Sequence, residues 1–267
     1  MDIQVQGSDV HVYTGSRTFD RTQPSIVFVH GAALDHSVWA LQSRYFAWHG
    51  ANVLAVDLPG HGRSQGAPCP SVEAIADWIP ALLDATGIAS ASLVGHSMGA
   101  LSILECAARH PARVERISML GPAVPMLVSD ELLAAARDDE QLAYAMITAW
   151  SFSAGKAIGS NPSPGMSMTA TALRLMQRTK QGTLENDLLA CRNYADGLAA
   201  AAALTCPAQL MLGMRDLMAP VRDTPPLIGA LRDVRVVKLA ETGHSLMAEQ
   251  PDAVLEALKS FLPHRPA

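Results

Sequence analysis

Gly95-His96-Ser97-Met98-Gly99 stands directly after a short apolar run at residues 91–94 and directly before a helix-like segment at residues 100–106. This placement predicts a strand, a sharp turn centred on Ser97 and then a helix. A serine at such a turn takes a strained backbone conformation that only small neighbours tolerate, which explains the glycine at each end of the pentapeptide. The turn would raise the Ser97 hydroxyl above the sheet, at the positive end of the helix dipole. The pattern therefore marks Ser97 as a candidate nucleophile.

The composition is typical of a compact globular protein. The chain has 267 residues, of which 49% are hydrophobic, enough for one domain with a subordinate insertion. The formal net charge is −5 and like charges form no run, which argues against nucleic acid as a partner. No window approaches the roughly 18 apolar residues of a membrane span. Residues 1–6 lack the pattern of a secretory signal, so we expect a cytoplasmic protein.

The four cysteines lie far apart and form neither a C-x-x-C pair nor a cluster with histidine. Metal ligation needs closer spacing, and disulfide frameworks are typical of much smaller secreted chains. We therefore expect reduced thiols at Cys69, Cys106, Cys191 and Cys206. No other pattern indicates a metal or an organic cofactor, so neither is expected.

Short apolar runs alternate with helical periodicity along most of the chain. Segments 3–5 and 10–13 alternate in polarity and predict an antiparallel hairpin. Runs that are apolar on both faces, as in a parallel sheet covered on both sides, occur at residues 26–29, 53–56, 91–94, 114–120, 208–212 and 234–239. Ser71 and Gly87 are typical caps of the helix between them, and similar periodicity marks residues 101–109 and 252–262. This order predicts a doubly wound α/β sheet.

One stretch, residues 122–203, breaks the alternation with a helical and loop-like pattern that offers no strand. A loop is predicted at residues 160–165, and helices are predicted at residues 130–137, 141–150, 168–179 and 184–203. The simplest account is a helical insertion after the sixth core strand, folded over the active edge of the sheet as a cap. Residues 1–121 and 204–267 would then form the core.

A serine nucleophile needs a base within hydrogen-bond reach and a carboxylate that orients this base. In open α/β sheets such groups collect on loops beyond the carboxyl ends of the strands. His244 follows the last predicted strand, and Asp216 follows the strand that ends at Leu212. A solvated loop histidine and a turn or N-cap aspartate are the alternatives. The loop after the sixth strand, at residues 121–124, carries no carboxylate, which favours Asp216 as the acid.

Attack on a carbonyl group creates an oxyanion, which preorganised N–H donors stabilise. One predicted donor is the backbone N–H of Met98, the residue after the candidate nucleophile. The other is the backbone N–H of Ala32, in the loop after the third strand, where Gly31 lets the chain approach the substrate closely. Both assignments follow from position, because side-chain identity matters little for a backbone donor.

A polar segment, Asp-Leu-Pro-Gly-His-Gly-Arg-Ser at residues 57–64, follows the fourth predicted strand. Asp57 and His61 could form a second acid–base pair. We favour a structural role, in which the polar groups of the loop satisfy its own backbone. His30 and His96 are likewise assigned structural roles, through hydrogen bonds to neighbouring loops.

Five motifs resemble, in the same order, those of the α/β-hydrolase superfamily over essentially the whole chain: His30-Gly31, residues 57–64, Gly95 to Gly99, Asp216 before Pro220, and Gly243-His244. The resemblance implies a mostly parallel eight-stranded sheet, a helical cap, and a catalytic triad in the chain order Ser97, Asp216, His244.

The residue types at positions 96 and 97 restrict which subfamilies the chain resembles. Haloalkane dehalogenases and epoxide hydrolases of the family carry aspartate there, so those activities look excluded. C–C hydrolases usually place Asn before the serine, haloperoxidases often Phe and enol-lactonases often Leu. His96 stands there in this chain, as in many esterases, lipases and thioesterases.

The predicted cap contains many methionine and aromatic residues, including Met126 and Trp150, and Met218 lies close to Asp216 in the sequence. Flexible thioether side chains suit adaptable apolar surfaces, so we predict that Met126, Trp150 and Met218 contact an apolar substrate. Packing between helices is the alternative for most of the methionines.

Together these features predict a serine hydrolase that cleaves small apolar carboxylic esters through an acyl-enzyme. A thioesterase, a lactonase or a C–C bond hydrolase would use the same triad. A non-catalytic ligand receptor on a hydrolase scaffold is the alternative from another class. The expected partner is a small molecule, and no pattern indicates an oligomeric state.

Overall fold

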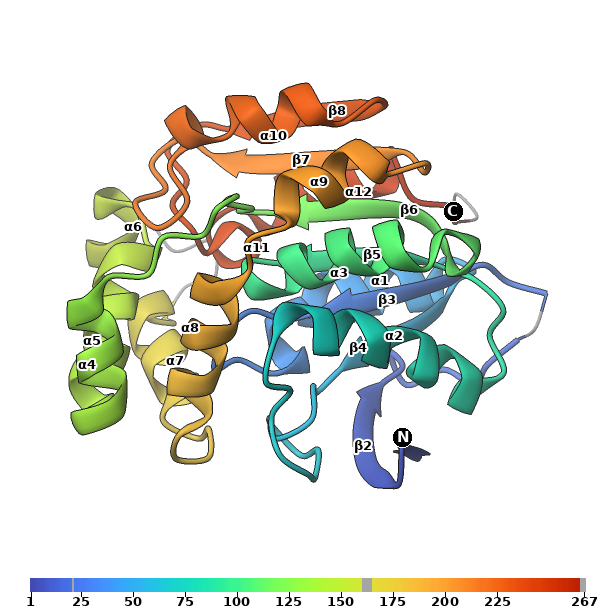
Figure 1. The fold of residues 1–267 in the computed structure, drawn as a ribbon, viewed down its shortest axis with the longest axis horizontal. Helices are drawn as coiled ribbons and strands as arrows, with labels where there is room; N and C mark the ends of the chain where they lie inside the picture. Colours follow the sequence, from blue (N-terminus) through green and yellow to red (C-terminus); the bar gives the residue numbers. More distant parts are fainter. Residues whose placement is uncertain (21, 160–164, 265–267) are drawn as a thin grey trace.

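Eight strands form one sheet, in the order β1-β2-β4-β3-β5-β6-β7-β8, in the computed structural model, which describes residues 1–20, 22–159 and 165–264 (Figure 1). The strands β1 (Asp2–Val5) and β2 (Ser8–Tyr13) form the predicted hairpin, and β2 pairs antiparallel with β4 (Asn52–Val56). The remaining strands run parallel: β3 (Ser25–Val29), β5 (Ala91–His96), β6 (Val114–Leu120), β7 (Ala208–Gly213) and β8 (Val234–Leu239). The predicted sheet is confirmed.

Helices cover both faces of this sheet. One face carries α2 (Val72–Thr86), α3 (Met98–Arg109) and α10 (Pro225–Ala230), and the other carries α1 (Ala40–Trp48), α11 (Leu246–Glu249) and α12 (Pro251–Lys259). Along β3, Val27 and Val29 join the first apolar cluster, and Ile26 and Phe28 join the second. Successive side chains of a strand point to opposite faces, so a strand buried on both sides reads as one continuous apolar run.

Local signals define the helix α2 at both ends. The Ser71 hydroxyl accepts a hydrogen bond from the Ala74 N–H at 3.1 Å, and Gly87 ends the helix in the left-handed region with φ 69°. The helix α1 was not predicted. Its exposed face carries the apolar residues Leu41 and Trp48, which mask the helical polarity pattern. Short 3-10 turns add η1 (His36–Trp39), η2 (Pro111–Arg113) and η3 (Val221–Asp223).

The segment between β6 and β7 is helical. It contains α4 (Asp130–Asp138), α5 (Glu140–Ser151), α6 (Ala154–Ile158), α7 (Met168–Met176), α8 (Thr183–Asn193) and α9 (Gly197–Ala203). Figure 1 shows α4, α5, α7 and α8 at the end of the sheet toward which the arrow of β7 points. Residues 160–164 of the predicted loop lie outside the described residues.

The prediction of one helix over residues 184–203 is wrong, because α8 and α9 are separate helices. The chain turns at Tyr194, which is buried and donates a hydrogen bond from its hydroxyl to Glu105 of α3 at 2.7 Å. Beyond this turn, Ala200 and Ala201 of α9 join the apolar cluster on the α3 face of the sheet. The last helix of the insertion therefore packs with the core.

The helices α4, α5, α7 and α8 of the insertion form an apolar cluster of their own, which includes Leu132, Tyr144, Met176 and Leu184. Ala33, from the loop after β3, is fully buried in the same cluster. No helix of the described residues is long and apolar enough to cross a membrane.

Candidate active site

Ser97 occupies the turn between β5 and α3, with φ 54° and ψ −116°. A positive φ is rare for any residue other than glycine and costs about 1–3 kcal/mol, so the surrounding structure must hold it. The Ser97 N–H donates to the Leu120 carbonyl at 3.0 Å, and the Ser97 carbonyl accepts from the Ala100 N–H at 2.8 Å. These two bonds fix the strained turn that the sequence predicts.

The two glycines of the pentapeptide allow close packing of the backbone around this turn. A Cβ atom on Gly95 would overlap the Gly99 carbonyl. A Cβ atom on Gly99 would overlap the carbonyl groups of Val29 and His30, at the end of β3. Because these obstacles are backbone atoms and not flexible side chains, any larger residue would push α3 away from the sheet.

Asp216 and His244 form a buried pair at the carboxyl ends of β7 and β8. His244 Nδ1 lies 2.8 Å from Asp216 Oδ2, and Asp216 Oδ1 accepts the N–H groups of Met218 and Ala219, each at 2.8 Å. Burial opposes ionisation of Asp216, but His244 and the two backbone donors outweigh it and lower the pKa of this carboxyl. Since a carboxylate only accepts, His244 Nδ1 carries the proton, and Nε2 presents its lone pair.

His244 Nε2 is buried and has no hydrogen-bond partner among the described residues. His244 and Ser97 both line a cavity of about 520 Å³. The structure therefore brings the predicted nucleophile and base to one cavity, with Asp216 behind the imidazole.

Apolar side chains dominate the walls of this cavity. The residues that were predicted to contact substrate, Met126, Trp150 and Met218, all line it. Further apolar lining comes mostly from the helical insertion, through Val128, Leu132, Ile147, Met176 and Leu188. A cavity of this character suits an apolar ligand held by a few polar groups.

The two predicted oxyanion donors are Met98, which follows Ser97 in the chain, and Ala32, which lines the same cavity as Ser97. Met98 is the first residue of α3, so its N–H has no acceptor within the helix. Ala32 lines the cavity, and the backbone at the preceding Gly31 lies close to Ser97. A Cβ atom on Gly31 would stand 3.3 Å from Ser97 Cβ and 3.0 Å from His96 Nδ1. This crowding explains the glycine before Ala32.

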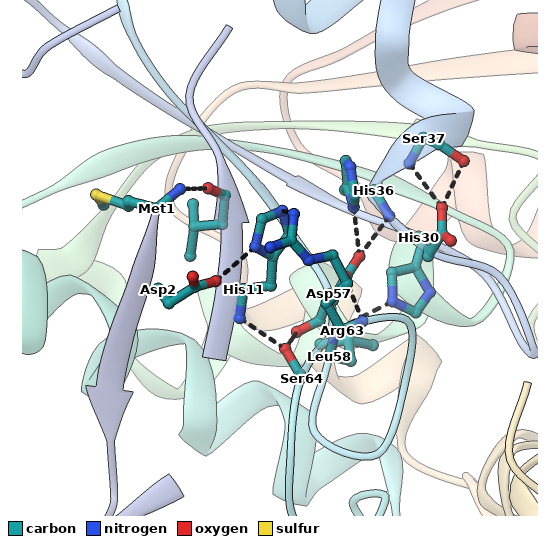
Figure 2. Close-up of polar contacts among 12 residues, drawn as sticks. Met1, Asp2, His11, His30, His36, Ser37, Asp57, Leu58, Arg63 and Ser64 are labelled. Atoms are coloured by element: carbon teal, nitrogen blue, oxygen red, sulfur yellow. Dashed lines mark hydrogen bonds and ion pairs between the residues drawn. The ribbon is translucent and has the colours of Figure 1, made fainter. Parts of the chain in front are cut away.

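His30 orients the peptide group that carries the Ala32 N–H. The Leu58 N–H donates to His30 Nε2 at 3.1 Å, as Figure 2 shows, so the ring proton is on Nδ1. Nδ1 then donates to the Gly31 carbonyl at 2.8 Å. Burial, with a smaller contribution from His61, lowers the pKa of His30 to about 4 and keeps the ring neutral. His30 thus holds the loop after β3 in place through its hydrogen bonds to Gly31 and Leu58.

His96 connects the turn at Ser97 to the loop that carries His244. Its Nε2 lies 2.9 Å from the His244 carbonyl, which can only accept, so Nε2 donates. Burial, followed by the neighbouring His244, lowers the pKa of His96 to about 3. The neutral ring therefore holds the His244 backbone in place.

Asp57 accepts hydrogen bonds from its own loop, at Arg63, and from His36 at the start of η1, as Figure 2 shows. Its Oδ1 accepts from the backbone N–H of His36 at 2.8 Å and from His36 Nδ1 at 2.7 Å, while Oδ2 accepts from the Arg63 N–H at 2.9 Å. Burial opposes ionisation, but these donors outweigh it and lower the pKa of Asp57 to about 2. Asp57 and His61 are not partners, because His61 pairs with Asp187 of α8 at 2.8 Å.

His11, His36 and Asp57 bring possible metal-ligand atoms within 4.8 Å of one another. These atoms already serve other contacts: His36 donates to Asp57, and Arg63 Nη1 lies 3.4 Å from His11 Nε2 (Figure 2). A guanidinium beside a ligand nitrogen disfavours a cation, so we assign this cluster to the folding of the loop.

Sequence reasoning missed two buried carboxylates near the site, Asp187 and Glu249. Glu249 accepts hydrogen bonds from the N–H of Gly243 at 2.9 Å and from the hydroxyl of Ser153 at 2.6 Å. It therefore joins the loop that carries His244 to the insertion. For Asp187, a polar residue on the apolar face of a predicted helix is the signal that could have found it, whereas Glu249 lies in α11, outside every predicted helix. In α8, Asp187 lies between the buried Leu184 and Cys191.

Comparisons with known proteins identify the family of this chain. Residues 26–257 match the model of the alpha/beta hydrolase family. A pimeloyl-[acyl-carrier protein] methyl ester esterase of Chromobacterium violaceum is 30% identical over 247 residues, which cover 90% of this chain and 94% of the relative. The corresponding esterase of Aromatoleum aromaticum is 28% identical over 251 residues, covering 86% and 94%.

Solved structures show the same fold. The enol-lactonase of Burkholderia xenovorans LB400 has a TM-score of 0.80 and 25% identity, covering 98% of this chain and 99% of that chain. An esterase of Exiguobacterium antarcticum has a TM-score of 0.84 at 18% identity, covering 97% and 98%. The chain belongs to the alpha/beta hydrolase family.

Proposed function

We propose that this protein is a serine hydrolase that cleaves small apolar carboxylic esters through an acyl-enzyme. Ser97 is the nucleophile, His244 the base and Asp216 the residue that orients the base. The observation that carries the proposal is the buried Asp216–His244 pair: His244 lines the same cavity as the strained Ser97, and its Nε2 has no hydrogen-bond partner among the described residues. Catalytic hydrogen bonds between base and nucleophile often tighten only when substrate binds.

The proposed reaction has two halves. Ser97 Oγ attacks the ester carbonyl while His244 Nε2 takes its proton, and the N–H groups of Met98 and Ala32 stabilise the oxyanion. Collapse of this intermediate releases the alcohol, which receives the proton from His244. Water then attacks the acyl-enzyme by the same route and releases the acid. Each oxyanion donor contributes about 100- to 1000-fold in kcat in comparable sites.

The cavity supports an apolar substrate of modest size. Residues 122–203 act as the cap in this proposal, and Met126, Trp150 and Met218 contact the substrate. The relatives named as pimeloyl-[acyl-carrier protein] methyl ester esterases support ester cleavage. All four cysteines are free, which supports the cytoplasmic location that we propose with this function.

A lactonase is the second candidate, because the enol-lactonase at 25% identity matches over nearly the whole chain. The same triad would open a cyclic ester by the same two steps. The two activities differ in the fate of the alcohol, which stays attached to the acyl group in a lactone.

The experiment that tests the proposal measures hydrolysis of p-nitrophenyl esters and lactones of graded chain length. We expect turnover by the wild type and its loss in Ser97→Ala. Ser90→Ala, which changes a half-buried serine bonded to Glu115, is the matched control and should keep full activity. Labelling of Ser97 by a fluorophosphonate without turnover of any substrate would instead indicate a ligand receptor.

A further inference from the structure

Ala33, next to the proposed oxyanion donor Ala32, is bound at both of its backbone polar groups by the helical insertion. The Ala33 N–H donates to Asp187 Oδ2 at 3.0 Å, and the Thr179 hydroxyl donates to the Ala33 carbonyl at 3.0 Å. Ala33 has φ 52° and is fully buried. A residue other than glycine keeps a positive φ only when its surroundings hold it there. Here both of the groups that hold Ala33, the Asp187 carboxylate and the Thr179 hydroxyl, come from the insertion.

Asp187 is itself anchored to the core. The same Oδ2 atom lies 2.8 Å from His61 Nε2, while His61 Nδ1 lies 3.0 Å from the Pro59 carbonyl. Burial works against a charged His61, but Asp187 outweighs it and raises the pKa of this histidine. Both side chains are 2% exposed. The carboxylate is thus held by the core loop at residues 57–64 while it binds the loop after β3.

The side chain of Ala33 shares this arrangement. It packs in the apolar cluster of the insertion, with Tyr144, Met176 and Leu184, although its backbone follows β3 of the core. The loop that carries Ala32 is therefore bound to the insertion by two hydrogen bonds and by apolar packing.

The peptide groups on either side of Ala32 are held by two different side chains, His30 and Asp187. His30 of the core binds the carbonyl of Gly31, which shares a peptide plane with the Ala32 N–H. Asp187 binds the N–H of Ala33, which shares a plane with the Ala32 carbonyl. With both planes held, the Ala32 N–H has one direction relative to Ser97.

We propose that Asp187 and Thr179 are positioning residues through which the helical insertion aims the Ala32 N–H at the oxyanion. This inference rests on the proposed function. Because an oxyanion donor stabilises the transition state more than the bound ester, loss of either contact lowers kcat and leaves KM nearly unchanged. The insertion thus shapes the reacting centre as well as the cavity.

The test uses the nearly isosteric variant Thr179→Val, which removes the donor to Ala33, and Thr179→Ser, which restores it. Asp187→Asn removes the charge that binds the Ala33 N–H. Lys180→Met is the matched control, since Lys180 also joins the insertion to the core, through the Ser64 carbonyl at 3.0 Å, and no hydrogen bond between described residues links its side chain to Ala33.

On p-nitrophenyl esters we expect kcat to fall about 3- to 10-fold in Thr179→Val and about 10- to 100-fold in Asp187→Asn, within the loss that follows removal of one donor. KM should change less than about twofold. Thr179→Ser and Lys180→Met should keep wild-type kcat. Affinity for a trifluoromethyl ketone, whose adduct with Ser97 carries an oxyanion, should fall in parallel with kcat, which a merely structural role would not cause.

A rise in KM with unchanged kcat in Thr179→Val, or an equal loss in Lys180→Met, would overturn this inference while leaving the hydrolase proposal intact. If Asp187→Asn does not fold, the Thr179 pair decides. A wild type without turnover on any ester or lactone would overturn the proposed function, and this inference with it.

Discussion

His244 Nδ1 lies 2.8 Å from Asp216 Oδ2, and less than one twentieth of either side chain is exposed to solvent. The second carboxylate oxygen is held by two backbone N–H groups, so the acid cannot turn away from the imidazole. This arrangement gives His244 one tautomer, with the lone pair on Nε2.

Asp216→Asn should lower kcat by about 10,000-fold, because an amide in this position favours the wrong histidine tautomer. Asp57→Asn is the matched control. Asp57 is also a buried carboxylate bonded to a histidine, but it lies in the loop at residues 57–64 and bonds His36 and the Arg63 N–H. Steady-state kinetics on one p-nitrophenyl ester compares the two. A larger loss of activity in Asp57→Asn would show that the wrong acid has been assigned.

Gly99→Ala should destabilise the fold by about 1–3 kcal/mol, because its Cβ would overlap backbone carbonyls at the end of β3. Gly229→Ala is the control. Gly229 lies in α10, is exposed and has open space where the added methyl group would stand, so alanine should stabilise by about 0.5–1 kcal/mol. Urea unfolding measures both. Equal stability of the two variants would contradict the role of close packing.

His96→Gln should flatten the acid side of the stability profile. The pKa of His96 in the fold is about 3, below the ordinary 6.5, so the neutral ring stabilises the protein above pH 6.5. As the pH falls from 6.5 toward 3, the unfolded chain takes up a proton that the fold excludes, and this stability is lost.

Glutamine does not titrate, but its amide can still donate to the His244 carbonyl. Between about pH 6.5 and pH 4, the free energy of unfolding should depend on pH less steeply in His96→Gln, by about 1.4 kcal/mol per pH unit. Urea unfolding at a series of pH values measures this slope. The same slope in both proteins would contradict a buried neutral His96.

Trp150→Ala should shift the substrate preference toward longer acyl chains. Trp150 lines the cavity, and removal of its ring leaves space that additional methylene groups can fill, each contributing about 0.8 kcal/mol. The ratio of kcat/KM values for long and short p-nitrophenyl esters measures the shift. Trp48→Ala, at an exposed position on α1, should leave the ratio unchanged, and the same change in both variants would contradict the prediction.

Local patterns predicted most of the fold. The glycines and apolar run around Ser97 predict the turn between β5 and α3, and Ser71 and Gly87 predict the ends of α2. These features depend on residues close together in the chain, where backbone sterics and capping act. The break between α8 and α9 could not be predicted this way, because it depends on the contact of Tyr194 with Glu105, 89 positions away.

In the candidate site, too, some features could be predicted from local sequence and others depend on contacts between distant residues. Placement at strand ends was enough to select Ser97, Asp216 and His244, because parallel strands bring their carboxyl ends to one edge of the sheet. It was not enough to pair the other buried acids and histidines. The sequence favoured structural roles for Asp57 and His61 without naming their partners, and the structure pairs Asp57 with His36, and His61 with Asp187.

The sequence by itself determined the sheet, the strained serine turn and the strand ends that carry the proposed triad, since each rests on short-range backbone chemistry repeated in a regular order. Tertiary structure alone decided how the helical insertion meets the loop after β3. Ala33 and Asp187 are 154 positions apart, and they meet only because apolar packing seats the insertion on the core.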